Sequence, residues 1–146
     1  MTDIAEVIRT VVTIPGEPVA QGRPRFARRG AFVSTYDPPK SRSWKSDART
    51  AMMDALECPS RLPYPQGVAL SVSVLAVFSR PKSAGKKPGR LLKVTRPDAE
   101  NVAKAVLDAG TGTLWHDDSQ VVDLQVSKRH GEPDEAPFVR LEVSVA

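Results

Sequence analysis

The sequence predicts one α+β domain, with a mixed or antiparallel sheet and two main helices. Segments in which apolar residues alternate, as they do in strands, occur near the start, in the middle and at the end of the chain. Two segments with helical spacing of apolar residues lie between them. The 146 residues match the length of one ordinary domain, and no repeat or low-complexity tract divides residues 1–146. This order of elements is typical of an α+β fold.

Four segments alternate strongly enough to be predicted as strands, and a fifth region reads as a hairpin. The segment from Val68 to Ser79 is apolar on every second residue and is expected at the centre of the sheet. Residues 26–36 are expected to form a hairpin whose tip carries Arg28 and Arg29. The four predicted strands are residues 4–14, 68–79, 121–126 and 138–145.

The first helix is predicted from Asp37 to about Glu57, because aspartate is a good N-cap and the prolines that follow suit a first turn. A second, shorter helix is predicted for residues 101–108, ending near Gly110. Another face of the first helix carries a basic stripe that either contacts nucleic acid or is solvated; it comprises Arg42, Lys45 and Arg49. The buried stripe of the first helix is expected to consist of Trp44, Ala48, Ala51, Met52, Ala55 and Leu56.

The composition of the chain limits the possible cell compartments and classes of protein. The single cysteine, Cys58, cannot form an internal disulfide, which fits a reducing cytoplasm. No apolar run is long enough to span a membrane, and the N-terminus does not resemble a signal peptide. Residues 1–96 carry a net charge of +10 and residues 97–146 a net charge of −6. A basic body with an acidic region suits an enzyme that cuts a polyanion, although ordinary solvated charge gives the same numbers.

Two basic regions are candidates for contact with phosphates, because arginine pairs bidentately with phosphate oxygens. The first is the turn and hairpin near residue 25, and the second is the region 80–96, which holds seven basic residues and no acidic ones. The second is predicted as a flexible loop. A solubilising loop and a disordered linker are the respective alternatives. The candidate DNA-binding residues are Arg23, Arg25, Arg28, Arg29, Lys86, Lys87, Arg90 and Lys93.

The acidic region places two groups of carboxylates around the second helix. Asp98 and Glu100 precede or open the helix, Lys104 follows on the same side, and Asp117-Asp118 lies in a turn beyond it. Crowded carboxylates disfavour one another's ionised form, and a hard cation such as Mg²⁺ relieves this while using oxygen ligands. The alternative is that Asp98 and Glu100 cap the helix and Lys104 pairs with Glu100.

The chain contains the motif R-P-D-A-E-N-V-x-K-x-V-L-D-A, followed by L-W-x-D-D-S-Q-V-V and a strand ending in Lys128. In these motifs it resembles the RusA family of Holliday junction resolvases, in particular its prophage-type members. The early Q-G-R-P-R is similar to that family's basic turn. The resemblance implies a homodimeric α+β nuclease that nicks four-way DNA junctions in symmetric pairs, using Mg²⁺ or Mn²⁺.

The resemblance also implies roles for individual residues. Asp98, Glu100 and Asp118 fall on the family's acidic catalytic positions and Lys104 on its catalytic lysine, with Asp117 as a further candidate metal ligand. The family usually has aspartate at the position of Glu100. Two other functions stay open: a non-catalytic module that binds branched nucleic acid, and a metal nuclease acting on RNA or flaps.

Overall fold

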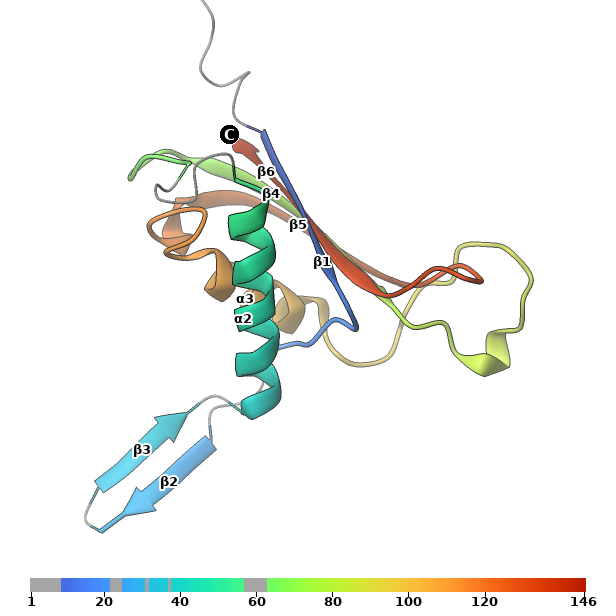
Figure 1. The fold of residues 1–146 in the computed structure, drawn as a ribbon, viewed down its shortest axis with the longest axis horizontal. Coiled ribbons are helices and arrows are strands. Elements are labelled where there is room, and N and C mark those ends of the chain that lie inside the picture. The colour runs from blue at the N-terminus through green and yellow to red at the C-terminus, as the bar shows by residue number, and fades with distance from the viewer. Residues whose placement is uncertain (1–8, 22–24, 31, 37, 57–62) are drawn as a thin grey trace, which may run out of the picture.

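The computed structural model describes residues 9–21, 25–30, 32–36, 38–56 and 63–146. These residues form a four-stranded sheet, a separate two-stranded hairpin and two long helices, α2 and α3 (Figure 1). The predicted α+β class, with a mixed sheet and two main helices, is confirmed. Within the described part of the chain, no helix combines the length and the apolar character needed to cross a bilayer.

The sheet has the order β1-β6-β4-β5, so β4 is a central strand, as predicted. β6 is antiparallel to both of its neighbours, whereas β4 and β5 run parallel. A parallel pair needs a crossover connection, and α3 supplies it between β4 and β5. The strands are β1 Arg9–Pro15, β4 Leu70–Phe78, β5 Val121–His130 and β6 Phe138–Val145.

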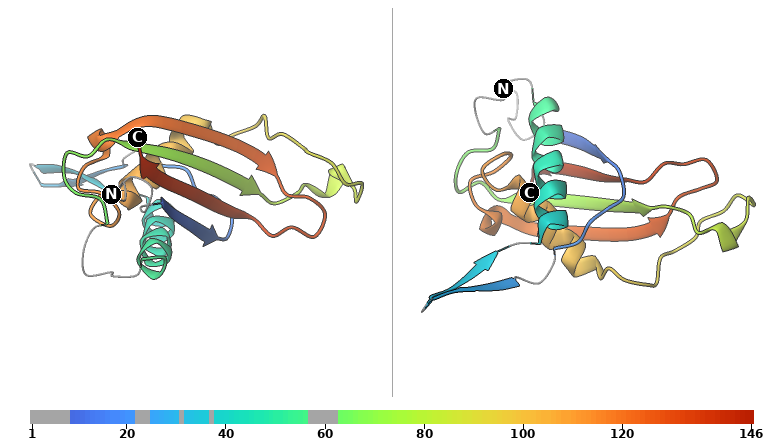
Figure 2. Two further views of the ribbon diagram at one scale, coloured as in Figure 1. Left: turned by 90° about the horizontal axis from the view of Figure 1, so that it is seen from above. Right: turned by 60° about the horizontal axis from the view of Figure 1, so that its bottom comes forward.

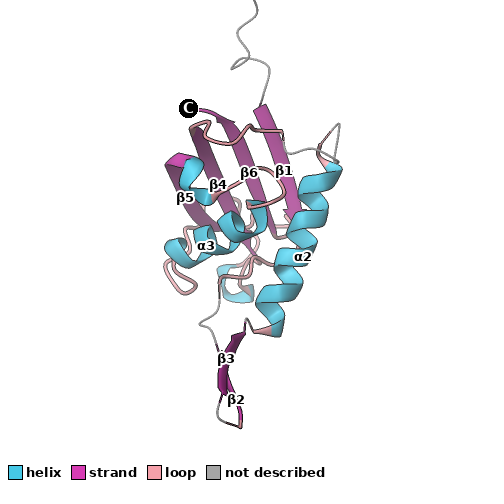
Figure 3. Ribbon diagram, turned by 90° about the vertical axis from the view of Figure 1, so that its left-hand side faces the viewer, coloured by secondary structure: helices cyan, strands magenta, loops and turns pink. Residues whose placement is uncertain are grey.

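The strand register gathers the apolar residues on one face of the sheet. Leu141 of β6 lies opposite Val12 of β1 and Val74 of β4, and Val74 lies opposite Val126 of β5. The helices α2 (Pro39–Asp54) and α3 (Ala99–Gly110) cover this face and leave the other face bare (Figures 1 and 3). The core therefore lies between the sheet and the two helices.

The first helix differs from its prediction in its ends and in one buried residue. Its N-cap position is Pro38, without a side-chain cap, and the predicted cap Asp37 lies outside the described residues. The helix ends at Asp54, and Ala55 is exposed where burial was predicted. Lys45 was expected on an exposed basic face but is 5% exposed.

The predicted hairpin is present and stands apart from the main sheet (Figure 2). Its strands are β2 Arg25–Arg29 and β3 Phe32–Tyr36. Gly30 follows β2 with φ of 61°, a left-handed conformation that glycine adopts without strain. The hairpin therefore carries Arg28 and Arg29 on an arm beyond the core.

The basic segment between β4 and α3 is tied down, where a flexible loop was predicted. The Arg80 guanidinium donates hydrogen bonds to the carbonyl oxygens of Gly85 (2.9 Å), Lys87 (2.9 Å) and Gly131 (3.2 Å). Further along, the His130 amide donates to the Leu91 carbonyl. These bonds fold the segment back onto the end of the sheet.

We predict that Gly110→Ala destabilises the protein by about 1–3 kcal/mol, although alanine favours a helix, because overpacking a filled core costs this much. A Cβ at Gly110 would lie 2.4 Å from a ring carbon of Trp115, which is fully buried. Urea unfolding measures the change. Ser43→Ala, at an exposed position of α2, is the control and should be neutral or slightly stabilising. A Gly110→Ala variant as stable as wild type would contradict the tight packing.

Candidate functional site

The crossover topology separates the two groups of carboxylates predicted from the sequence. A helix that connects two parallel strands runs antiparallel to them, so the residues before and after it lie at opposite ends. Asp98 is the N-cap of α3, and Asp117-Asp118 follows the turn that leaves its C-terminal end. Ten residues of helix from Asp98 to Asp108 correspond to about 15 Å along the axis. Within one chain, therefore, the structure does not bring these two groups together.

At the N-terminal end of α3, the ion pair considered as an alternative to a metal site is present, but side-chain capping by Asp98 is not. The Lys104 ammonium lies 3.4 Å from the Glu100 carboxylate, and both side chains are largely exposed. Asp98 has the backbone conformation of an N-cap, yet its side chain forms no capping hydrogen bond. Its carboxylate is exposed at the positive end of the helix dipole. This end presents two carboxylates and one lysine to solvent.

Lys128 on β5 fixes the segment that leads into Asp98, and the sequence did not single it out for this role. Its ammonium donates to the carbonyl oxygens of Thr95 (2.9 Å) and Pro97 (2.8 Å). Charge-assisted bonds of this kind are stronger than neutral ones. A lysine within an otherwise alternating strand was the available signal. Lys128 thus holds the start of α3 against β5.

The Asp117-Asp118 turn is held by Gln120, a second residue whose role was not recognised. Its side-chain carbonyl accepts from the backbone amides of His116 (2.9 Å) and Asp117 (3.1 Å). Its side-chain amide donates to the carbonyls of Pro65 (2.9 Å) and Val68 (3.0 Å). Gln120 itself is buried, and all four bonds are at least partly shielded from water. They fasten the acidic turn to the segment that enters β4.

The two acids of this turn share a hydrogen bond and have pKa values shifted in opposite directions. The pKa of Asp117 is lowered, chiefly by the backbone amide of Ser119 and also by its bond with Asp118. The pKa of Asp118 is raised, first by its bond with Asp117, then by burial and by the nearby charges of Asp117 and Asp108. Adjacent carboxylates resist simultaneous ionisation, and a bound cation would relieve this repulsion.

Asp108, near the C-terminal end of α3, has a partner on the other helix. Its Oδ2 lies 3.5 Å from the Nζ of Lys45, the buried lysine of α2. The Arg49 guanidinium also donates to the Asp108 backbone carbonyl at 3.3 Å. A buried ammonium needs such a partner. Asp108 therefore joins the two helices while contributing negative charge near Asp118.

The carboxylates suit a divalent cation in chemistry but not in arrangement within a single chain. Carboxylate oxygens are the ligands that Mg²⁺ and Mn²⁺ prefer. In the part of the chain that the structure describes, however, no three His, Cys, Asp or Glu side chains converge to hold one metal ion. Each end of α3 offers at most a pair of the predicted ligands.

The predicted DNA-binding residues lie on the hairpin and on the basic segment. Arg28, Lys86, Lys87 and Arg90 are exposed. Lys93 is half-buried, with its ammonium 4.7 Å from the centre of the Phe78 ring and 3.0 Å from the Thr95 hydroxyl. Arg23 lies outside the described residues, and only the backbone of Arg25 and Arg29 is described.

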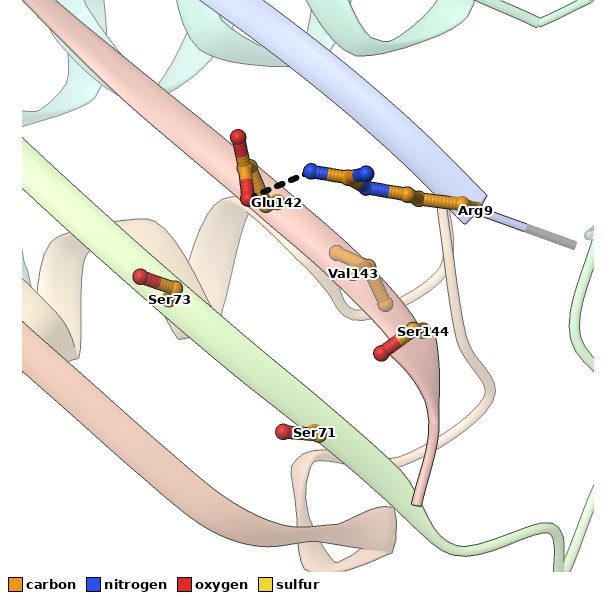
Figure 4. Close-up of a pocket in the computed structure, with 6 residues that line it drawn as sticks. All are labelled: Arg9, Ser71, Ser73, Glu142, Val143 and Ser144. Atoms are coloured by element: carbon orange, nitrogen blue, oxygen red, sulfur yellow. Dashed lines mark hydrogen bonds and ion pairs between the residues drawn. The ribbon is translucent and has the colours of Figure 1, made fainter.

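The bare face of the sheet carries a shallow depression remote from the predicted site. Figure 4 shows Arg9 reaching across it to Glu142, with Nη2 3.1 Å from Oε2. None of the predicted acidic or basic residues lines it; its lining consists of Arg9, Ser71, Ser73, Glu142, Val143 and Ser144. The candidate chemistry therefore lies around α3 and not in this depression.

Comparison with known proteins finds similarity over almost the whole chain. The family model described as "Endodeoxyribonuclease RusA" matches residues 15–145. A relative described as "Uncharacterized protein YqaN" from Bacillus subtilis (strain 168) is 37% identical over 138 residues, which is 90% of this chain and 95% of that protein. The matched region includes both carboxylate groups, Lys104, Gln120 and Lys128.

We predict that Gln120→Leu destabilises the protein by about 2–4 kcal/mol, because it leaves four backbone groups without their partner. It should also speed hydrogen exchange at the amides of His116 and Asp117, which Gln120 binds. Urea unfolding and exchange mass spectrometry measure the two effects. Gln125→Leu, at an exposed position of the strand that follows Gln120, should stay within about 0.5 kcal/mol of wild type. Equal effects of the two substitutions would contradict a specific role for Gln120.

Proposed function

The chain belongs to the RusA endodeoxyribonuclease family, and from this we propose that it resolves four-way DNA junctions by paired, symmetric nicks in the presence of Mg²⁺. Family membership makes the protein an endonuclease, a hydrolase of phosphodiester bonds within DNA, and confirms the resemblance found in the sequence. RusA nucleases act on junction DNA and generally depend on a divalent metal. The choice of Mg²⁺, its replacement by Mn²⁺, the pairing of the nicks and the residues below belong to the proposal.

The observation that supports this proposal best is the exposed pair Asp117-Asp118. The two carboxylates share a hydrogen bond, and the pKa of Asp118 is raised by it. Among the described residues, no lysine or arginine forms an ion pair with either acid. A solvent-facing pair of acids with no cationic partner is an arrangement that gains from binding a divalent ion.

The proposed roles follow from the charge of each group. Asp98, Glu100 and Asp118 hold the metal ion, with Asp117 as a further ligand, and a bound Mg²⁺ supplies Lewis-acid stabilisation and an activated water. Lys104 is exposed beside Glu100 and stabilises the charge that builds on the scissile phosphate. The glutamate at position 100 keeps the charge of the family's usual aspartate and reaches one methylene further.

The hairpin and the basic segment supply the contacts to the DNA backbone in this proposal. Arg28 stands at the tip of the arm formed by β2 and β3, and Lys86, Lys87 and Arg90 are exposed on the segment before α3. Such contacts position the nucleic acid without reading its sequence. Each of the two basic regions would therefore orient an arm of the junction relative to α3.

We propose that the protein acts as a homodimer, for two reasons. A four-way junction has two-fold symmetry, and paired nicks require two active sites related by it. In addition, one subunit holds its carboxylate groups at opposite ends of α3, so a second subunit can place Asp117-Asp118 of one chain beside Asp98 and Glu100 of the other. In the described residues of one chain no complete set of ligands forms.

We predict that the wild-type protein nicks a synthetic four-way junction in Mg²⁺ or Mn²⁺ at paired symmetric positions, and leaves linear duplex intact. Asp118→Asn should lose more than the roughly 10–100-fold that outer-shell partners of a metal contribute, because it removes a proposed ligand. Denaturing gels of end-labelled strands measure the nicks. Asp134→Asn is the matched control, since Asp134 is exposed on a remote turn, has φ of 68° and asparagine tolerates that conformation.

Other outcomes would replace the proposal. Salt-sensitive junction binding without cleavage, unchanged in Asp98→Asn and Asp118→Asn, would indicate a binding module. Faster cleavage of an RNA hairpin or a flap than of the junction would indicate a different substrate class. Cleavage by Asp118→Asn at the wild-type rate would remove this residue from the site.

We predict that Asp117→Asn and Asp118→Asn change thermal stability in opposite directions at pH 7. The raised pKa of Asp118 means that its ionised form is disfavoured by folding, so removing the charge should leave the melting temperature equal or higher. The lowered pKa of Asp117 means that its ionised form stabilises the fold above its unfolded-state pKa, so Asp117→Asn should lower the melting temperature. Both differences should shrink as the pH falls through the pKa of each group and wild type becomes protonated. Calorimetry at several pH values measures this, and a clear loss of stability in Asp118→Asn at pH 7 would contradict it.

A further inference from the structure

The charged residues of α2 are divided between two sides of the helix. One side borders β1, where Asp47 and Asp54 lie two turns apart in a shallow depression. The other side carries only basic charges, at the spacing of three and four residues that places side chains on one face. We call it the basic side of α2, and it consists of Arg42, Lys45 and Arg49.

Contacts with α3 show where the basic side points. The ammonium of the buried Lys45 lies 3.5 Å from the Asp108 carboxylate, and the Arg49 guanidinium donates to the Asp108 backbone carbonyl at 3.3 Å. Arg42 is exposed two turns before Arg49 on the same side. The basic side therefore borders the solvent-facing stripe of α3, which consists of Glu100, Lys104 and Asp108.

Both carboxylates of the α3 stripe already have a lysine as partner. Glu100 pairs with Lys104 at 3.4 Å, and Asp108 pairs with Lys45. In the described part of the chain, neither arginine of the basic side forms an ion pair with a carboxylate. The face shared by α2 and α3 therefore has a surplus of positive charge, which the two exposed arginines supply. Arginine is the side chain whose donors match phosphate oxygens best.

This surplus lies between the hairpin arm and the acidic turn. Figure 1 shows the arm of β2 and β3, which carries the exposed Arg28, at the N-terminal end of α2. Further along α2, Arg49 contacts Asp108, whose charge acts on Asp118 of the acidic turn. From Arg42 to Arg49 the distance along the helix axis is about 10.5 Å. At about 3.4 Å for each nucleotide of one strand, this length corresponds to about three nucleotides of DNA.

We propose that the basic side of α2 is a track for the DNA backbone, on which Arg42 and Arg49 bind phosphates of one junction arm between the hairpin and the Asp117-Asp118 turn. The proposal rests on the proposed function, which makes junction DNA the ligand. The sequence left open whether this stripe contacts nucleic acid or is solvated, and neither arginine is among the predicted DNA-binding residues. Lys45 contributes indirectly, because its ion pair neutralises Asp108, which would otherwise repel the phosphates.

The first test measures binding of a labelled four-way junction by fluorescence anisotropy, without divalent metal, over a series of KCl concentrations. Arg42→Gln and Arg49→Gln should each reduce the slope of log K against log [KCl] by about one, because each removes one phosphate contact. The double variant should bind roughly 10-fold or more weakly at about 0.15 M salt. Replacing both arginines by lysine should keep the wild-type slope, since the slope counts the charges that meet phosphates.

Lys40→Gln is the matched control for these variants. Lys40 is an exposed cation of the same helix, but it lies seven residues before Asp47 and hence on the side that borders β1. Its loss removes the same charge and should change neither the affinity nor the salt slope. Circular dichroism should show all of the variants folded.

The second test locates the DNA by a crosslink and removes no arginine. Cys58→Ser replaces the single native cysteine, and Ser46→Cys then places a thiol about one turn from each arginine. Labelled with a photoactivatable aryl azide, this thiol should crosslink to the junction. Asp47→Cys, the next residue along and on the side that borders β1, should crosslink much less under the same conditions.

The proposal is overturned if the glutamine variants bind the junction as wild type does, if Lys40→Gln weakens binding equally, or if only Asp47→Cys crosslinks. Tighter binding of an RNA hairpin than of the junction, lost in the same variants, would assign the track to RNA and also overturn it. Because binding is measured without metal, a chain that binds along this track but nicks no junction supports the track and rejects the proposed function. Conversely, junction cleavage by wild type, with binding unchanged in the arginine variants, supports the function and rejects the track.

Discussion

The parallel pairing of β4 with β5 is the constraint on which the arrangement of the site depends. Two parallel neighbours must be joined by a crossover, and here the crossover is α3. The helix then runs opposite to both strands, which sends Asp98 to one end and Asp117-Asp118 to the other. Lys128 on β5 and Gln120 just before it each secure one of these ends to the sheet.

Electrostatics distinguishes the two ends of α3. At the N-terminal end the helix dipole favours Asp98, and Lys104 neutralises Glu100. Near the other end, Asp108 is paired with Lys45, but Asp117 and Asp118 are left to share a hydrogen bond. The end with the least compensation for its negative charge therefore gains most from a cation. Further carboxylates brought to this end by a partner would increase the electrostatic repulsion. A metal ion bound between the carboxylates would turn this repulsion into a net attraction.

The sequence predicted the strands that begin near Val68 and Phe138 well, because every second residue in them is apolar and faces the core. It did not decide between a mixed and an antiparallel sheet, since alternation identifies the buried face of a strand but not its neighbour. The order strand, helix, strand from Val68 to Val126 was the available sign of a parallel crossover. That order, taken as a crossover, already implies that the two carboxylate groups lie at opposite ends of the helix.

The positions of individual polar side chains were harder to predict, for a physical reason. Lys45 follows Arg42 at helical spacing, which predicts an exposed side chain, yet it is buried and forms an ion pair with Asp108 on the other helix. Gln120 is a polar residue in an otherwise ordinary turn, and its role comes from hydrogen bonds to four backbone groups that two different segments supply. Such roles depend on contacts between segments distant in sequence, which periodicity cannot report.

The basic segment before α3 shows how the same limit affects predictions about DNA binding. Its glycines and charges suggested a flexible loop, but Arg80 is consumed by carbonyl groups of the loop itself and of the turn after β5. Lys93 is likewise engaged, over the ring of Phe78. The cations that remain exposed, Lys86, Lys87 and Arg90, are thus presented from a framework fixed to the sheet. Ordering a mobile loop costs conformational entropy. A segment that is already fixed therefore binds a phosphate backbone with a smaller loss of conformational entropy than a mobile loop would. Arg80 was not among the predicted DNA-binding residues, and its hydrogen bonds hold the segment that presents these three cations.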